Sequence, residues 1–178
     1  MAYEEKTIES KIVYEGPIFN VRKYEVSAFN GKETYRDVVE HNGGAVMLAI
    51  TDDGKILMEK QFRKPLEREV IELPAGKIDP GEKPEVTAAR ELKEETGYTA
   101  EKIKLLTKIV PSCGYSQETL WIYICKGLVP GEKCWDDTEN IDLFEMDADK
   151  VIDMIMAGKI LDAKTMCGVL YARVAGEI

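Results

Sequence analysis

The chain has 178 residues, of which 44% are hydrophobic and 32% are charged, and its formal net charge at pH 7 is −9. This length and composition fit one globular domain of ordinary size and exclude a disordered chain. The negative charge argues against nonspecific binding to nucleic acid, and no apolar run is long enough to span a membrane. Because residues 1–11 lack a basic segment followed by an apolar run, we expect no signal peptide and a cytoplasmic location.

The first third of the chain predicts β-strands, because β-branched and aromatic residues are frequent and turn sequences separate the runs. The expected strands cover residues 11–14, 19–29, 34–41, 45–51 and 55–62. Asn30-Gly31 predicts a hairpin between the second and third strands, and Asp52-Asp53-Gly54 predicts another between the fourth and fifth. The run 45–51 is apolar throughout, which indicates a strand buried on both faces.

Strands and helices alternate in the rest of the chain. The expected strands cover residues 69–73, 102–110, 120–125 and 141–146, and the expected helices cover 84–96, 148–157 and 162–175. A polar, acidic loop is expected over residues 128–140. This order of elements predicts the α/β or α+β class.

The predicted helix 84–96 has recognisable ends and an expected inner face. Pro84 suits the first helical turn, and Gly97 suits the C-terminal cap. The apolar residues that we expect to face the core are Val86, Ala89 and Leu92.

Three glutamates crowd the second half of this helix. At about 100° per residue, Glu91, Glu94 and Glu95 lie on one face, where they repel one another close to the helix end that disfavours anions. A divalent cation such as Mg²⁺ takes hard oxygen ligands and would remove this conflict. Arg90 precedes Glu94 by four residues and is expected to pair with it. A solvated acidic face is the alternative interpretation.

The residues around this helix resemble the Nudix box, the signature of the Nudix hydrolases. That box reads Gly, five residues, Glu, seven residues, then Arg-Glu-apolar-x-Glu-Glu-x-Gly-apolar. The matching fixed positions are Gly76, Glu82, Arg90, Glu91, Glu94, Glu95 and Gly97. Leu92 fills the first apolar position and Tyr98 the last, where an aliphatic residue is commoner. Seven fixed positions at set spacing make the motif highly specific.

The resemblance implies an α/β/α sandwich with a mixed sheet, preceded here by an N-terminal antiparallel β extension. It implies Mg²⁺ as cofactor, or Mn²⁺ in its place, and hydrolysis of a pyrophosphate by water that the metal activates. The implied metal ligands are Glu91, Glu94, Glu95 and the backbone carbonyl of Ala75. The implied structural residues of the box are Gly76, Glu82 and Gly97.

Beyond the box, most of the chain is similar to the ADP-ribose pyrophosphatases within this family. The similar segments are residues 8–19, 59–63, 68–77 and 162–165. The resemblance implies that Arg63 contacts a phosphate with help from Arg68, and that Glu118 binds sugar hydroxyls. Glu72 either hydrogen-bonds a ribose hydroxyl or closes an ion pair. The implied catalytic residues are Arg90, Glu94 and Glu139, the last as a base or extra metal ligand from the acidic loop, where Glu139 aligns better than Asp137.

One departure concerns the substrate. The subfamily usually has Ser-Pro-Gly-aromatic after the box, whereas this chain has Ser112-Cys113-Gly114-Tyr115. Because proline fixes φ in a turn, its replacement by Cys113 could change the loop near the terminal sugar of the substrate. The sequence therefore does not determine which sugar that is. Hydrolysis of ADP-ribose to AMP and ribose 5-phosphate is the leading hypothesis, and another nucleotide sugar such as GDP-mannose or UDP-glucose is the alternative.

We expect residues 1–42 to form a β region that takes part in a homodimer, and residues 43–178 to form the hydrolase domain. Two non-enzymatic interpretations remain beside this one, a nucleotide-binding module with the same fold and an acidic interaction domain. Binding modules of this family commonly lose box glutamates, whereas this chain keeps them all. The expected partner is a small nucleotide sugar, without nucleic acid or membrane.

Four cysteines and a single histidine further restrict the chemistry. No two cysteines form a Cys-x-x-Cys pair, which disfavours a structural zinc site and favours reduced thiols. His41 stands beside the turn sequence Asn42-Gly43-Gly44, and a single histidine argues against Ser-His-Asp or Cys-His catalysis.

Overall fold

The computed structural model describes residues 4–132 and 140–178, and the chain divides into two compact units. The first unit is Met1–Gly43 with Val110–Thr119, and the second is Gly44–Ile109 with Leu120–Ile178. The sequence predicted a boundary close to residue 43, but it gave no indication that residues 110–119 group with the N-terminal strands. No helix in the described part of the chain combines the length and apolar character of a membrane span.

The first unit is built on an antiparallel sheet of three strands, in the order β1-β2-β3. Its strands are β1 (Lys6–Glu15), β2 (Asn20–Ser27) and β3 (Glu33–Glu40). The predicted hairpin at Asn30-Gly31 is confirmed, because β2 pairs with β3 and Gly31 adopts a φ of 78° in the turn. Residues 110–119 join the sheet at Val39, whose N–H donates to the carbonyl of Tyr115 at 2.7 Å.

The second unit contains two sheets. The larger is mixed and has the order β7-β4-β9-β8, with β4 and β9 parallel. Its strands are β4 (Gly44–Ala49), β7 (Ala75–Lys77), β8 (Tyr98–Ile109) and β9 (Leu120–Pro130). The smaller is antiparallel, in the order β10-β5-β6. It consists of β5 (Lys55–Arg63), β6 (Arg68–Glu72) and β10 (Ile141–Asp147), and the short 3-10 helix η1 (Lys64–Leu66) joins β5 to β6.

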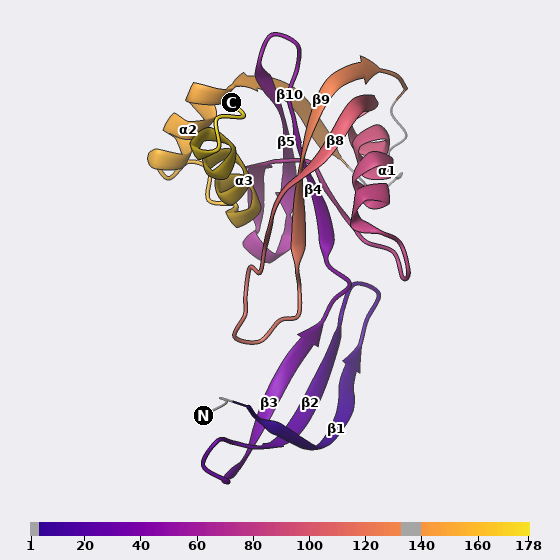
Figure 1. Cartoon of the computed structure of the whole chain (residues 1–178), viewed down its shortest axis with the longest axis vertical. Helices are drawn as coiled ribbons and strands as arrows, with labels where there is room; N and C mark the ends of the chain where they lie inside the picture. The colour runs from indigo at the N-terminus through magenta and orange to yellow at the C-terminus, as the bar shows by residue number, and fades with distance from the viewer. Residues whose placement is uncertain (1–3, 133–139) are drawn as a thin grey trace. The chain divides into compact units, whose positions relative to one another are not determined.

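Three helices cover opposite sides of the β4 strand. They are α1 (Pro84–Thr96), α2 (Ala148–Met156) and α3 (Ala163–Val174). Val46 and Leu48 of β4 pack in one apolar cluster with α2 and α3, whereas Ala45 and Met47 pack in a second cluster with α1. Since side chains alternate along a strand, the two clusters lie on opposite faces (Figure 1). The predicted sandwich is therefore confirmed, as is the doubly buried strand.

The structure corrects the predicted hairpin at Asp52-Asp53-Gly54. The strands on either side of this turn, β4 and β5, belong to different sheets and share only the isolated bridge between Ile50 and Ile56. A turn sequence indicates that the chain reverses, but it does not indicate whether the two strands then pair. Part of the predicted loop around residue 76 is also a strand, β7, because it pairs with β4.

Three of the four cysteines lie in the described residues, and all three are free thiols, namely Cys113, Cys125 and Cys167. Burial in the core raises the pKa of the Cys125 thiol to about 12. This thiol therefore stays protonated and unreactive at neutral pH.

Candidate active site

Helix α1 begins and ends where the sequence predicted. Pro84 occupies the first turn, and Gly97 forms the C-terminal cap with a φ of 76°, its N–H donating to the carbonyl of Lys93 at 2.9 Å. A positive φ suits glycine, which has no Cβ to clash. The helix therefore stops directly after Glu94 and Glu95.

The buried face of α1 differs in part from the predicted one, since Leu92 is buried as predicted and two other residues are not. Val86 and Ala89 are exposed, and the buried residues of the helix are Thr87, Ala88, Leu92, Glu95 and Thr96. The expectation was wrong because it assigned the inner face to apolar residues and the outer face to the carboxylates. Glu95 is instead 7% exposed and lies on the same face as Leu92.

We call Glu91, Glu94 and Glu95 the α1 stripe. Their burial decreases across the helix, since the side chain of Glu91 is 14% exposed and that of Glu94 is 43% exposed. The stripe thus extends from the protein interior to solvent, which is the placement that an ion entering from water requires.

Arg90 joins two members of the α1 stripe. Its Nη1 donates to Oε1 of Glu91 at 2.7 Å and to Oε2 of Glu94 at 2.9 Å. The sequence predicted the pair with Glu94 but not the bond to Glu91. These carboxylates raise the pKa of the Arg90 guanidinium further, after the larger effect of Glu82. Arg90 consequently stays charged and fixes two carboxylates side by side.

Glu82 ties the loop before the helix to the same arginine. Its two oxygens accept from Nε of Arg90 at 3.2 Å and from Nη2 at 3.0 Å, and Oε2 also accepts from the hydroxyl of Thr87 at 2.7 Å. Hydrogen bonds from Arg90 and, to a smaller extent, from Thr87 lower the pKa of Glu82 to about 2. This geometry is what a loop-holding role requires, and that role stays a prediction.

Gly76 lies in close contact with the α1 stripe. A Cβ at this position would lie 1.9 Å from Cδ of Glu91, so a larger residue would occupy the space that the carboxylate fills. Gly76 and Ala75 belong to β7, where Ala75 pairs with Val46. The preceding residue, Pro74, accepts a hydrogen bond from the N–H of Met47 at 2.9 Å. The backbone beside Glu91 is therefore fixed on β4.

The α1 stripe has the donor chemistry that Mg²⁺ prefers. Its carboxylates offer hard oxygen atoms, and the absence of a Cβ at Gly76 leaves a cradle for one of them. Within residues 4–132 and 140–178, no three such side chains are already gathered closely enough to hold a metal. Arg90 holds Glu91 and Glu94 instead. The residues fit a divalent cation that shares these carboxylates with Arg90.

Three predicted substrate residues line one hollow of about 570 Å³ in the second unit. Arg63, Arg68 and Glu72 contribute to it, together with η1 and the segment 158–162 between α2 and α3. Glu72 is buried, and its Oε1 accepts from Nε of Arg63 at 2.7 Å. The structure therefore contains the ion pair that was one of the two roles open for Glu72, and the ribose contact stays a prediction.

Glu59 and Lys164 are buried charges that the sequence did not single out. Glu59 is 0% exposed and Lys164 is 8% exposed. Lys164 forms an ion pair with Glu72. One signal was available, because Glu59 follows the apolar run 56–58 and lies on the same strand face as Leu57, Gln61 and Arg63.

The remaining predicted residues lie outside this constellation. Glu118 belongs to the first unit, where its Oε1 lies 3.8 Å from Nδ1 of His41. Glu139 lies outside the described residues, so its role stays a prediction.

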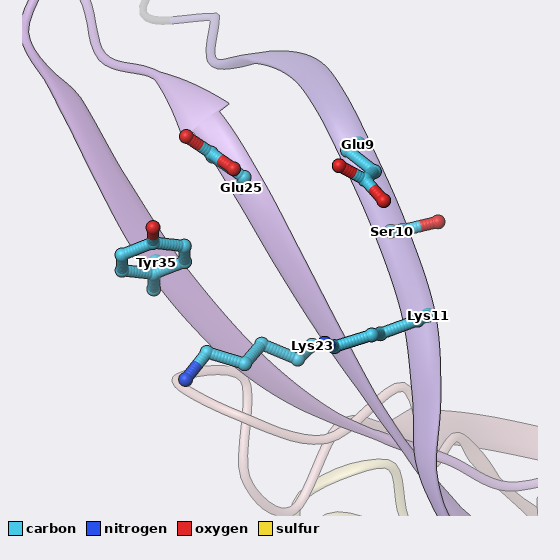
Figure 2. A pocket seen from close by; sticks show the side chains of 6 residues that line it. All are labelled: Glu9, Ser10, Lys11, Lys23, Glu25 and Tyr35. Carbon is cyan, nitrogen blue, oxygen red and sulfur yellow. The ribbon is translucent and has the colours of Figure 1, made fainter.

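The first unit also carries a hollow of about 260 Å³ on its sheet. The side chains that line it come from all three strands (Figure 2), and Nζ of Lys23 lies 4.9 Å from the ring centre of Tyr35. Acidic and basic groups alternate here, so the hollow has no excess of carboxylates comparable to the α1 stripe.

Comparison with known proteins places this geometry in a family. A family model of the NUDIX domain matches residues 41–164. The chain is 39% identical over 170 residues to an ADP-ribose pyrophosphatase of Bacillus subtilis, with 94% of this chain and 92% of that protein covered. It is also 39% identical over 171 residues to a methanol dehydrogenase activator of Bacillus methanolicus, covering 95% and 92%.

A solved structure shares the fold. The crystal structure of an ADP compounds hydrolase superposes with a TM-score of 0.86 at 20% identity, covering 98% of this chain and 95% of that one. The box residues around α1, the sandwich and these matches agree, and the chain belongs to the Nudix hydrolase family.

Proposed function

We propose that the protein hydrolyses the diphosphate of a nucleoside diphosphate sugar, with ADP-ribose as the foremost substrate and AMP and ribose 5-phosphate as products. The observation that carries this proposal is the α1 stripe, packed under Gly76 and held by Arg90. The name of the Bacillus subtilis relative supports ADP-ribose. The equally similar Bacillus methanolicus relative has a name of another kind, so identity alone does not select the substrate.

We assign Glu91, Glu94, Glu95 and the carbonyl of Ala75 as the ligands of a divalent cation, Mg²⁺ or Mn²⁺ in its place. When bound, such a cation neutralises diphosphate charge and activates water. Arg90 orients Glu91 and Glu94, since it contacts both carboxylates through one nitrogen atom.

Arg63 and Arg68 are the proposed phosphate-binding residues. Both line the hollow of about 570 Å³, which lies within the usual range of roughly 300–1,000 Å³ for small-molecule sites. The hollow and the proposed metal ligands are close in the chain, because Glu72 on the wall of the hollow precedes Ala75 by only three residues. We keep Glu118 as a proposed contact for sugar hydroxyls.

Glu139 is the proposed catalytic base. We expect Glu139→Gln to lower kcat about a hundredfold, in the usual range for loss of a general base, while KM changes much less. Asp137→Asn in the same loop is the matched control and should leave kcat within twofold. Equal kcat in Glu139→Gln and the parent would move the base to another residue.

A substrate panel tests the proposed function. Purified protein is incubated with ADP-ribose, GDP-mannose or UDP-glucose, with Mg²⁺ or with EDTA, and the nucleoside monophosphate and sugar phosphate are measured by chromatography. We expect the highest kcat/KM for ADP-ribose and no turnover in EDTA. Faster cleavage of GDP-mannose or UDP-glucose would replace the proposed substrate. Failure to cleave any of them would favour a nucleotide-binding module.

We also propose that residues 1–42 take part in a homodimer. Every residue of β1 is exposed, and the first unit exposes large apolar side chains, including Val13 at 52%. Exposed apolar patches on a soluble protein often mark a surface that another chain covers. We expect Val13→Asp to lower the mass measured by light scattering from two chains to one. Val110→Asp, equally exposed but outside the sheet, is the control and should leave the dimer intact.

On the grounds of composition we further propose a cytoplasmic location. Fractionation of cells followed by detection with an antibody would test it, and recovery of the protein outside the cytoplasmic fraction would contradict it.

A further inference from the structure

Three charged side chains are buried where β5, β6 and α3 meet. They are Glu59, Glu72 and Lys164, with exposed fractions of 0%, 2% and 8%. Glu59 and Glu72 are direct partners in the pairing of β5 with β6. Burying an unpaired charge costs several kcal/mol. A fold that buries three charged side chains together must therefore provide each of them with a partner. With Arg63 they form what we call the Glu72 network.

Glu72 divides its two oxygens between two cations. Oε1 accepts from Nε of Arg63 at 2.7 Å, and Oε2 accepts from Nζ of Lys164. Nζ of Lys164 also lies 3.1 Å from Oδ2 of Asp162, the residue that caps the N-terminus of α3. Glu72 therefore connects the start of α3 to Arg63 through its carboxylate.

The two cations differ in what they can reach. The side chain of Arg63 is 40% exposed and lines the hollow of about 570 Å³, whereas that of Lys164 is 10% exposed and does not line it. Within the described residues, Arg63 makes its hydrogen bond to Glu72 through Nε alone. Its two Nη groups are left for a ligand, and such a planar pair suits two phosphate oxygens.

Strand geometry places Glu59 and Arg63 of the Glu72 network on the face of β5 that is directed toward α1. Leu57, Glu59, Gln61 and Arg63 lie on one face of β5, because alternate residues share a face. Leu57 packs with Ala88 and Leu92 of α1. The face that carries Arg63 is therefore the face that leads to the α1 stripe.

We propose that Lys164 is a positioning residue for substrate binding, which holds Glu72 so that Glu72 holds the Arg63 guanidinium in the orientation that binds phosphate. This inference rests on the proposed function, in which Arg63 contacts the diphosphate. Lys164 never touches the substrate and acts through two successive ion pairs.

The two contacts of Glu72 explain why this position needs a cation. Without Lys164, Oε2 of Glu72 would lose its cation, and only the bond from Arg63 to Oε1 would fix the orientation of the carboxylate. The carboxylate could then adopt other side-chain torsions, and the Arg63 Nε that it holds would move with it. Removal of Lys164 therefore frees the Arg63 side chain to adopt other rotamers.

The test is a double-mutant cycle with two readouts. The single variants Lys164→Met and Arg63→Gln and their combination are compared for KM and kcat with ADP-ribose, and for ADP-ribose affinity by calorimetry in EDTA. We expect Lys164→Met to raise KM and the dissociation constant about tenfold while kcat changes less than threefold. In the Arg63→Gln background, the same substitution should change both constants less than twofold, because its route through Arg63 is already lost.

Two further variants separate positioning from stability. Val169→Ala removes buried volume from α3 without touching the Glu72 network, and it should lower Tm while leaving KM unchanged. Lys164→Arg keeps the charge and should recover part of the lost affinity. If Lys164→Met does not fold, Lys164→Arg decides the question by the same cycle.

Independent effects of Lys164 and Arg63 that multiply in the double variant would overturn the inference, as would an unchanged affinity in both Lys164 variants. Failure of the proposed function looks different, because the parent protein would then not cleave ADP-ribose at all. Calorimetry still tests the role of Lys164 in that case. If the parent protein does not bind ADP-ribose in this measurement, the inference about Lys164 is overturned.

Discussion

The α1 stripe and the Glu72 network both place glutamates beside an arginine, but they differ in burial and in charge balance. In the stripe, one arginine contacts three carboxylates, counting Glu82, and the side chains extend to solvent. In the network, two carboxylates face two cations, and three of the four groups are buried. Excess negative charge near water can be balanced by ions from solution, whereas buried charge must be balanced by the protein itself.

Removal of one carboxylate from the α1 stripe should have the largest effect. We expect Glu95→Gln to reduce kcat/KM by about 10³ or more, because an amide cannot replace an anionic oxygen in holding a divalent cation. The glutamine has nearly the same shape, so Tm should change little. Steady-state kinetics with ADP-ribose at several Mg²⁺ concentrations provides the measurement.

Glu85→Gln supplies the matched control for this substitution. Glu85 lies in the first turn of the same helix and is exposed, so its loss should leave kcat/KM within twofold. Equal activity of Glu95→Gln and the parent would remove the α1 stripe from the mechanism.

A methyl group at Gly76 should disturb the α1 stripe while the fold is kept. In Gly76→Ala the new Cβ overlaps the carboxylate end of Glu91, which can rotate away because it ends a flexible side chain. We expect activity to fall by about a hundredfold, in line with the usual cost of a misplaced catalytic group, with a much smaller change in Tm.

The control for Gly76→Ala is Gly114→Ala, because no atom lies within 4 Å of a Cβ built there. Activity and Tm should both stay close to the parent in this variant. If Gly76→Ala kept full activity, the contact between Gly76 and Glu91 would have no bearing on catalysis.

The sequence predicted the α1 stripe far better than the Glu72 network, and the reason is the range of the interactions. The ends of α1 depend on Pro84 and Gly97, and the spacing of its glutamates is set by the helix itself, so both can be read from neighbouring residues. The burial of Glu59 and Lys164 depends on a contact between β6 and α3 that joins residues 92 apart. No local pattern determines such a contact.

Long-range packing also explains the two errors. Val86 and Ala89 are apolar and helical, but α1 turns Glu95 inward beside the correctly predicted Leu92 and leaves both of them exposed. The strands around Asp52-Asp53-Gly54 separate into two sheets because β4 pairs with β7 and β9, and β5 pairs with β6 and β10. In both cases the choice of partner, and not the local sequence, decides the outcome.

Titration of the Glu72 network should appear in the stability of the protein. Burial and, to a smaller extent, the charge of Glu72 raise the pKa of Glu59 to about 7. The contacts with Lys164, Gln61 and Arg63 lower this pKa, but their effect is smaller. Because the pKa is raised on folding, stability from the neutral carboxyl is fully present below the ordinary glutamate pKa of 4.5 and is lost as pH rises through 7. At about 1.4 kcal/mol per pKa unit, this loss is roughly 3 kcal/mol.

Glu59→Gln should remove this pH dependence. The free energy of unfolding, measured with urea at pH 5 and pH 8, should then fall less between the two values than it does in the parent. Glu145→Gln, on the exposed side of β10, is the control and should follow the parent. Parallel curves for Glu59→Gln and the parent would show that Glu59 does not titrate in this range.

The backbone between Glu72 and Gly76 is anchored from both layers of the second unit. The N–H of Leu73 donates to the hydroxyl of Thr165 at 2.8 Å, and the carbonyl of Pro74 accepts from Met47 at 2.9 Å. This short segment therefore works as a rigid spacer of fixed length between the guanidinium fork of Arg63 and the carbonyl of Ala75. A ligand that contacts both ends must match that length, so the anchored segment restricts which ligands can reach the guanidinium and the carbonyl together.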